Sequence, residues 1–230
     1  MNLTPGTLSL EGLRPRTGRG TRIVVVDSGV HASHPHVAGV AGGVGVLADG
    51  TLTEDFVDRL GHGTAVTAAI REKAPEAEIF VSRVFDRRLE ASADALVAAI
   101  RWAVERGADL INLSLGTSNP AHATALQTAV DQARAAGAWV VAAGEQDGVR
   151  WLPGALDDVV AVQLDWGLVR DTVVVEIRDD GGVRLRASGY PRPIPGVPPE
   201  RNLKGISFAV ANATGLLALL RGEATRDDRR

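Results

Sequence analysis

The sequence contains no cysteine, so disulfides, thiol nucleophiles and Cys-ligated metals are excluded. It also lacks any apolar run close to the roughly 18 residues that span a membrane. Residues 1–6 show no basic segment followed by an apolar stretch, which a secretory signal would have. We therefore expect a cytoplasmic protein with no membrane partner.

The chain carries no excess of positive charge. Its 25 basic and 28 acidic residues give a formal net charge of -3, and no basic stripe stands out. Nucleic acid is therefore not expected as a partner. The 230 residues, 45% of them hydrophobic, suit one globular domain. We expect this domain to cover residues 1–222, with 1–17 as an N-terminal extension and 223–230 as a flexible charged tail.

Short β-branched runs alternate with helical segments through the first two thirds of the chain. Such alternation predicts a parallel sheet with helices on its faces, which is a three-layer α/β/α fold with a mainly parallel sheet. Ser92 is a plausible N-cap, and Pro120 is suited to a first helical position. The predicted strands cover residues 23–26, 78–84, 109–113, 139–143 and 159–164, and the predicted helices cover 62–71, 92–106 and 120–137.

The pattern changes after about residue 165. Residues 172–178 and 183–187 flank an Asp-Asp-Gly-Gly turn, which predicts a β-hairpin. A proline-rich stretch follows over 190–199, and residues 207–220 form a long apolar segment typical of a buried helix. Residues 28–60, rich in Gly, His and Pro, are expected to form loops with one hairpin.

Three short segments carry residues suited to nucleophilic catalysis. Asp27 follows the first predicted strand, His62 begins a predicted helix, and Ser207 lies where a loop becomes a helix. A serine hydroxyl needs a base within hydrogen-bond reach, and a histidine with a pKa near neutrality can serve. A carboxylate can fix the imidazole tautomer, and the backbone N–H of Ser207 can face a developing oxyanion.

In order and context, these segments resemble the subtilisin-like serine peptidases. Asp27-Ser-Gly resembles the acid motif of that family, residues 61–66 (Gly-His-Gly-Thr-Ala-Val) the histidine motif, and residues 205–209 (Gly-Ile-Ser-Phe-Ala) the serine motif. The resemblance implies that Asp27, His62 and Ser207 form a catalytic triad. Segments 112–116 and 140–144 resemble the strands that flank the substrate in that family. It further implies substrate-binding residues at Leu113, Ser114, Leu115, Gly116, Ala142, Ala143 and Gly144.

Two positions depart from the family pattern in the oxyanion region. Glu145 stands where the family has an asparagine donor, and Ile206 stands where the family has threonine. An ionised carboxylate accepts hydrogen bonds and cannot donate them. Three explanations remain open: Glu145 is protonated in a buried pocket, Gln146 or Asn202 supplies the donor, or the fold binds peptides without cutting them.

Neither a metal nor a cofactor is expected. His31, His34 and His36 are close in sequence and could hold a metal, but a solvent-facing loop is the simpler interpretation. The short segment after His62 leaves little room for the calcium-binding insertion that the family often carries, so a tight calcium site of that type is not expected. Trp151 either packs against neighbouring residues or lines a substrate pocket.

The functional hypothesis that follows from the resemblance is a serine endopeptidase that acts through an acyl-enzyme. The compact chain suggests limited processing of a specific peptide or protein. One alternative is a catalytically impaired peptidase-like module that binds peptides or proteins. Another is a transpeptidase or macrocyclase, in which an amine replaces water. Cleavage preference and oligomeric state stay open.

Overall fold

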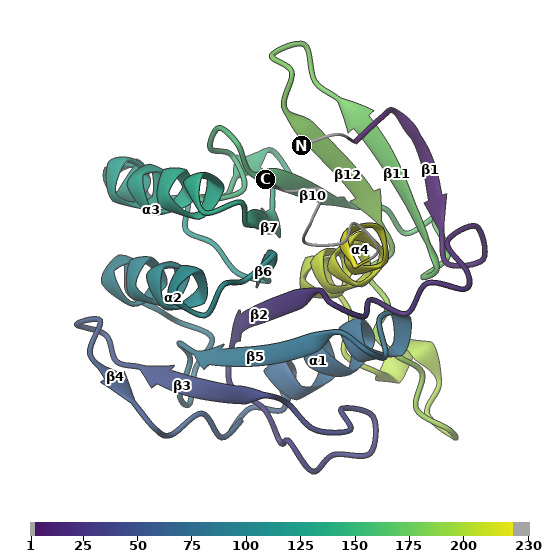
Figure 1. Ribbon diagram of the computed structural model, residues 1–230, viewed down its shortest axis with the longest axis horizontal. Helices are drawn as coiled ribbons and strands as arrows, with labels where there is room; N and C mark the ends of the chain where they lie inside the picture. The colour runs from purple at the N-terminus through teal and green to yellow at the C-terminus, as the bar shows by residue number, and fades with distance from the viewer. Residues whose placement is uncertain (1–2, 223–230) are drawn as a thin grey trace.

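The computed structural model describes residues 3–222, so the expected tail at 223–230 lies outside the described residues. Ten strands of this part form one sheet (Figure 1). In spatial order they are β1 (Gly6–Ser9), β11 (Thr172–Ile177), β12 (Val183–Ala187), β10 (Val160–Leu164), β7 (Trp139–Ala143), β6 (Leu110–Leu113), β2 (Arg22–Asp27), β5 (Glu78–Arg83), β3 (Gly42–Val46) and β4 (Leu52–Thr53).

The sheet is parallel from β12 through β3, and antiparallel pairs occur towards its two edges. Strand β2 shows why its sequence reads as one apolar run: Ile23 to Val26 are fully buried, because helices cover both faces. The chain order reverses at β2, which lies between β6 and β5. In open α/β sheets, such a reversal opens a crevice at the carboxyl ends of the strands.

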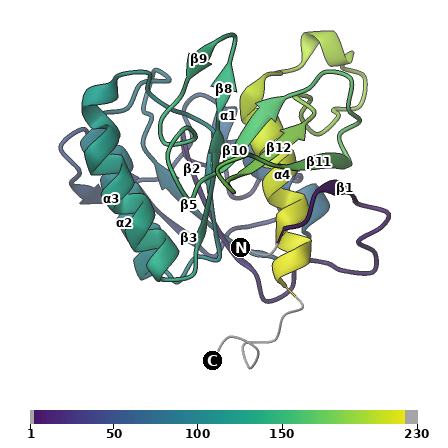
Figure 2. The same cartoon turned by 90° about the horizontal axis from the view of Figure 1, so that it is seen from above.

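The helices form two layers with the sheet between them. Figures 1 and 2 show α2 and α3 on one face, and α1 and α4 on the other. The predicted three-layer α/β fold is therefore confirmed. The helices are α1 (His62–Lys73), α2 (Ala93–Glu105), α3 (Ala123–Ala135) and α4 (Ile206–Arg221), with short 3-10 turns η1 (Pro120–His122) and η2 (Pro199–Arg201).

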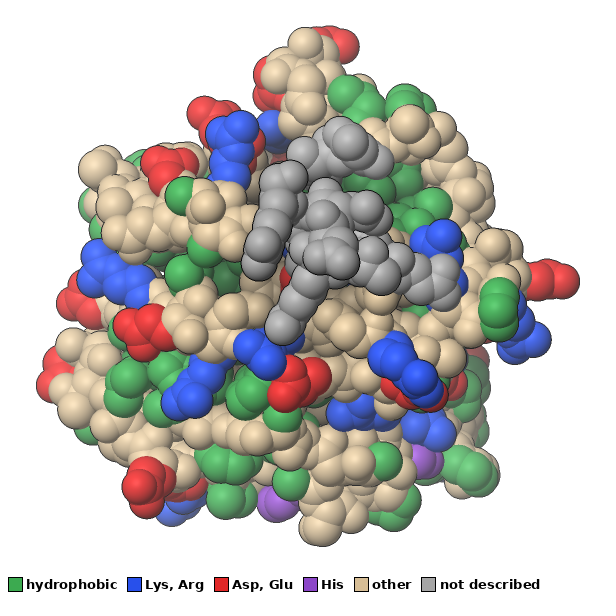
Figure 3. Space-filling model, viewed as in Figure 1, with side chains coloured by type: hydrophobic (Ala, Val, Ile, Leu, Met, Phe, Trp, Pro, Cys, Tyr) green, Lys and Arg blue, Asp and Glu red, His purple; other side chains and the backbone are tan. Residues whose placement is uncertain are grey.

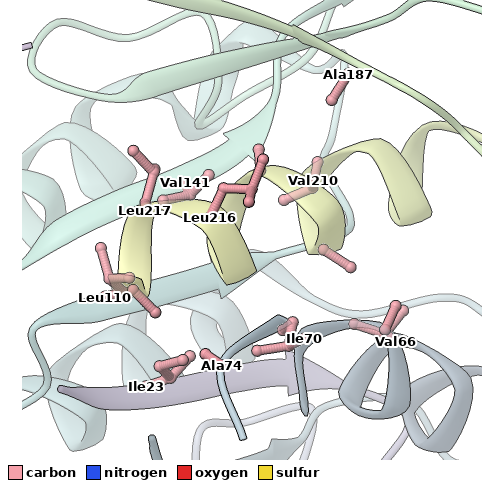
Figure 4. Packing of buried hydrophobic residues seen from close by; sticks show 14 of the residues in the cluster. Ile23, Val66, Ile70, Ala74, Leu110, Val141, Ala187, Val210, Leu216 and Leu217 are labelled. Carbon is pink, nitrogen blue, oxygen red and sulfur yellow. The ribbon is translucent and has the colours of Figure 1, made fainter. Parts of the chain in front are cut away.

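Helix α4 lies in one of the two hydrophobic cores formed by residues 3–222. Figure 4 shows Leu216 and Leu217 of α4 packed beside Val141 of β7 and Leu110 of β6, while Ile70 of α1 faces them from below. These side chains are buried, and each such side chain contributes roughly 1.5–3 kcal/mol through removal from water. This packing fixes α4, and with it the residues at its N-terminus.

Local signals set the helix starts close to where the sequence predicts them. The Ser92 hydroxyl accepts a hydrogen bond from the Ala95 N–H at 3.0 Å, which caps α2 as expected. The predicted helix at 120–137 is split, because Asn119 caps the 3-10 turn η1 before α3 begins.

Several elements differ from the sequence prediction. The expected hairpin within residues 28–60 exists as β3–β4, but β3 also joins the parallel sheet beside β5. The expected N-terminal extension contributes β1, which pairs with β11 at the sheet edge. A further hairpin, β8 (Glu145–Gln146) with β9 (Val149–Arg150), was not predicted. Its Asp-Gly turn is a strong hairpin signal that the sequence did contain.

Acidic and basic side chains are interspersed on the face drawn in Figure 3, with no large patch of one sign among the coloured atoms. Within residues 3–222, no helix is both long enough and apolar enough to cross a bilayer.

Candidate active site

Asp27 and His62, which lie 35 residues apart in sequence, meet at the carboxyl end of β2. His62 Nδ1 lies 2.7 Å from Asp27 Oδ1, and the Asp27 side chain is fully buried. Asp27 Oδ1 also accepts the Ser28 N–H at 2.7 Å, so the carboxylate is held from its own backbone. A carboxylate in this position fixes which ring nitrogen of the histidine carries the proton.

Two glycines allow α1 to approach the end of β2 this closely. A Cβ on Gly63 would lie 2.3 Å from the carbonyl oxygen of Gly29, so no larger residue fits there. Gly29 itself has φ 98°, and a Cβ on it would lie 2.4 Å from the carbonyl oxygen of Phe56. Steric crowding therefore explains the glycine of the Asp27-Ser-Gly motif and the glycine that follows His62.

Ser207 is the second residue of α4, and it lines the same cavity as His62. Its hydroxyl donates to the carbonyl oxygen of Ser114 at 3.0 Å. The Ser207 N–H belongs to the first turn of α4, where helix N–H groups have no partner within the helix. The hydroxyl is thus directed at Ser114 in this structure.

A buried polar chain supports the serine from behind. Thr214 Oγ1 donates to Asn112 Oδ1 at 3.0 Å, and Asn112 Nδ2 donates to Ser114 Oγ at 2.9 Å. Ser114 Oγ in turn donates to the backbone carbonyl of Ser207 at 3.2 Å. This chain links the end of β6 to α4, so the two elements hold a fixed register beside the cavity.

The cavity has a volume of about 670 Å³ and runs away from Ser207 between two segments of backbone. On one side, Leu115 and Gly116 have no backbone hydrogen-bond partner among the described residues. On the other side, residues 89–91 are also unpaired within residues 3–222. An extended peptide could pair with both edges by strand addition. Trp151 lines this cavity together with His62 and Ser207.

The backbone of Ala142 to Gly144, the second expected substrate edge, is paired within the described residues. Ala142 and Ala143 are buried in β7, which lies between β6 and β10 and pairs with both. The Gly144 N–H donates to Val162, and its carbonyl accepts the N–H of Trp151. None of the three residues lines the cavity. Of the two predicted substrate strands, only the end of β6 faces it, with Ser114, Leu115 and Gly116; Leu113 is fully buried.

Two of the three explanations for Glu145 lack support in its surroundings. Glu145 is exposed on β8 and does not line the cavity, so it lacks the buried pocket that one explanation requires. Asn202 instead donates to the Arg192 carbonyl and accepts the Leu203 N–H. Gln146 donates to Asp147 on the same hairpin. Neither amide lines the cavity beside Ser207.

The environment of His62 favours its charged form. Burial alone would lower the pKa of the imidazole. The hydrogen bond to Asp27 and the charge of Asp27, followed by the charge of Asp58, outweigh burial, and the pKa is raised above its usual 6.5. A histidine with a raised pKa is a stronger proton acceptor once it is deprotonated.

The histidine-rich loop does not form a ligand set. His34 Nδ1 accepts the backbone N–H of His36, and the two rings contact edge to face. Among residues 3–222, no group of three or more His, Asp or Glu side chains is arranged to hold a metal ion.

Sequence reasoning missed two parts of the site. Residues 89–91 form a cavity wall, although a loop before a capped helix carries no local signal of contact with Ser207. Asp58 is buried just before α1 and binds its first turn. An acidic residue shortly before a helix start is a capping signal, and it could have been found.

The sequence is similar to those of known proteins from one family. The sequence profile of the Subtilase family matches residues 18–163. Subtilisin DY of Bacillus licheniformis is 33% identical over 161 residues, which cover 63% of this chain and 56% of that protein. Subtilisin E of Bacillus subtilis (strain 168) is 33% identical over 141 residues, covering 57% of this chain and 36% of its own length.

A solved structure shares most of the fold. The prenylagaramide maturation protease PagA superposes with a TM-score of 0.66 at 25% identity, and the match covers 92% of this chain and 79% of that chain. The likeness therefore extends beyond the region matched by the family profile.

Proposed function

Because the chain belongs to the subtilase family, we propose that it is a serine endopeptidase that cuts peptide bonds through an acyl-enzyme. Ser207 is the nucleophile, His62 the general base and then acid, and Asp27 the residue that orients His62. The observation that carries the proposal is the 2.7 Å contact between His62 Nδ1 and Asp27 Oδ1, beside a cavity that Ser207 also lines.

The reaction follows from these positions. With Nδ1 hydrogen-bonded to Asp27, the other ring nitrogen of His62 is free to take the Ser207 proton as Oγ attacks the peptide carbonyl carbon. The carbonyl electron pair moves to oxygen and forms a tetrahedral oxyanion. When the oxyanion collapses, His62 gives the proton to the leaving amine, and an ester to Ser207 remains. Water then attacks this ester in the same way, with His62 as base, and releases the carboxylic acid product and free Ser207.

The oxyanion is stabilised mainly by backbone. The N–H of Ser207 lies at the N-terminus of the 16-residue helix α4, where the helix dipole favours negative charge. No asparagine or glutamine among residues 3–222 lines the cavity beside Ser207. Loss of one side-chain donor costs about 100- to 1,000-fold in turnover, a figure measured in this same family. We therefore expect slow turnover, which suits limited processing better than bulk digestion.

The proposed substrate is an extended peptide or a protein segment. It would lie between Leu115–Gly116 and residues 89–91, pairing with the unpartnered backbone of both. The similarity to PagA, which is described as a maturation protease, supports processing of a particular precursor.

A fluorophosphonate probe tests the activated serine. Intact mass is measured after exposure of the protein and of Ser207→Ala, both shown to be folded by circular dichroism. One added phosphonyl group on the parent protein, and none on Ser207→Ala, is the expected result. Absence of labelling on folded parent protein across pH 5–9 would contradict the proposed chemistry.

A second candidate is a peptide-binding module without turnover. The missing side-chain donors and the donation of the Ser207 hydroxyl to Ser114 favour it. Peptide binding that survives Ser207→Ala, from a parent that no fluorophosphonate labels, would support this module instead. If labelling occurs, product masses distinguish hydrolysis from ligation to an amine, because only hydrolysis incorporates oxygen from ¹⁸O-labelled water.

A further inference from the structure

Asp58 is a buried carboxylate that none of these steps uses, and only 2% of it is exposed. Its Oδ1 accepts hydrogen bonds from Ser28 Oγ at 2.9 Å, the Leu60 N–H at 2.9 Å and the Gly61 N–H at 2.8 Å. Its Oδ2 accepts the N–H of Thr64 at 2.9 Å and the hydroxyl of Thr64 at 2.6 Å. Every partner is a donor, so the site is built for the ionised form.

Asp58 supplies the cap that α1 lacks in its own N-cap residue. Gly61 occupies the N-cap with φ 80° and has no side chain to accept a hydrogen bond. The Asp58 carboxylate instead accepts the N–H of Thr64, the third residue of the helix, and adds negative charge at the positive end of the helix dipole. It therefore fixes the turn that begins with His62.

Ser28 connects the same carboxylate to the loop that carries Asp27. The Ser28 hydroxyl donates to Asp58 and accepts the N–H of Gly63 at 2.8 Å. The Ser28 N–H donates to Asp27 Oδ1. Asp58 is thus joined to both partners of the Asp27–His62 pair through short hydrogen bonds, without touching either side chain.

The charges around His62 come from several elements. Asp27 lies at the end of β2 and Asp58 before α1, while the ring of Phe208 on α4 faces the imidazole at 5.8 Å between centroids. Glu90, Asp94 and His122 line other parts of the cavity. Burial alone would raise the pKa of Asp58, but the hydrogen bonds led by Thr64 outweigh it and hold that pKa below its usual value. Asp58 is therefore ionised at neutral pH.

We propose that Asp58 is a positioning residue of the reaction centre, which locks the first turn of α1 to the Asp27 loop and adds a second negative charge behind His62. The proposal rests on the function proposed above, because it takes His62 as the base. Its first test needs no turnover, so the two can fail separately.

That first test is the titration of His62 by NMR in Ser207→Ala protein, with the resonance assigned by its loss in His62→Gln. Asp58→Asn is expected to lower the pKa of His62, since it removes one of the charges that raise it. Asp55→Asn is the matched control, because Asp55 lies in the same loop but is half exposed and pairs with Arg59. An unchanged His62 pKa in folded Asp58→Asn, or an equal change in the control, would overturn the proposal.

The second test measures the rate of fluorophosphonate labelling against pH. As the pH is lowered, the labelling rate of the parent protein should fall because His62 becomes protonated, and the midpoint of this fall should lie above pH 6.5. Asp58→Asn should label about 10- to 100-fold more slowly, as misplaced reacting groups do, and its midpoint should move to lower pH. A purely structural role would lower the melting temperature and leave the midpoint in place.

Ser28→Ala keeps the proposal testable if Asp58→Asn does not fold. It removes the hydroxyl that links Asp58 to Gly63 but keeps the Asp58 charge. Slower labelling with an unchanged midpoint is the expected result. Labelling at the parent rate by folded Ser28→Ala would show that the link does not position the centre.

Discussion

Replacement of Lys73 by methionine should stabilise the fold. Lys73 lies in the last turn of α1 and is 1% exposed. Its stem packs on α4, where a Cβ on Gly215 would lie 2.9 Å from Lys73 Cβ. Its ammonium lies 3.4 Å from Asp171 Oδ1 and 3.7 Å from Glu72 Oε2, which is longer than the roughly 2.8 Å of a good charged hydrogen bond.

The magnitude follows from the pKa of Lys73. Burial first, and then the nearby charge of Arg170, lower this pKa from 10.5 to about 8, against the opposing effect of Glu72 and Asp171. A difference of about 2.5 between the unfolded and folded pKa, at about 1.4 kcal/mol per unit, makes the charged form cost about 3 kcal/mol on folding. Methionine keeps the length of the stem and removes the charge.

The contribution of Lys73 to stability depends on pH, because its pKa differs between the folded and the unfolded chain. Below about pH 8, Lys73 is protonated in both states, and the full cost is present. Between about pH 8 and 10.5, the unfolded chain holds a proton that the folded chain has lost, so the free energy of unfolding rises with pH. The advantage of Lys73→Met should therefore shrink across this window.

Urea unfolding, followed by circular dichroism in a Ser207→Ala background to prevent self-cleavage, measures the effect. At pH 7, Lys73→Met should raise the free energy of unfolding by about 1–3 kcal/mol, or the melting temperature by roughly 3–10 °C. Lys204→Met is the matched control, because Lys204 is the other lysine of the chain and is exposed. A less stable Lys73→Met at pH 7, or an advantage that does not shrink by pH 10, would refute the reasoning.

Two further substitutions test the cavity. Glu145→Asn should change the rate of fluorophosphonate labelling by less than about threefold, because residue 145 is exposed and outside the cavity; a gain of tenfold or more would return this residue to the oxyanion. Trp151→Ala should extend cleavage, read by mass spectrometry of a peptide library, to larger side chains at the cut site, since Trp151 lines the cavity with Ser207. An unchanged set of cut sites would mean that the indole does not limit the pocket.

The interior strands could be predicted because a strand that is buried on both faces has a continuous apolar sequence. Residues 23–26 are β-branched and fully buried, so the apolar run alone indicates a strand covered on both faces. Strand β3 has the sequence Gly-Gly-Val-Gly-Val, which has weak strand propensity, and it forms because β5 offers a partner edge. Strand β1 likewise depends on β11, which lies more than 160 residues away in sequence.

In the candidate site too, some features follow from local sequence and others depend on how distant strands pair. The proposed roles of Asp27, His62 and Ser207 come from the sequence, because each residue lies in a short motif whose residue types fit the chemistry. The substrate role of Ala142 to Gly144 stays a prediction, and the structure adds that β10 and the segment at Trp151 pair with backbone groups of these residues. Which edge stays free is decided by the pairing of other strands.

By itself, the sequence determined the alternation of strands and helices, the N-cap of α2 at Ser92, and the residues that we propose as acid, base and nucleophile. Those features depend on residue type and near neighbours. The tertiary structure alone decided that the Ser207 hydroxyl contacts Ser114, that Glu145 is exposed, that Asp58 lies behind His62, and that Lys73 is buried. These depend on contacts between residues distant in sequence, because burial and hydrogen-bond partners are set by packing, which local propensity does not encode.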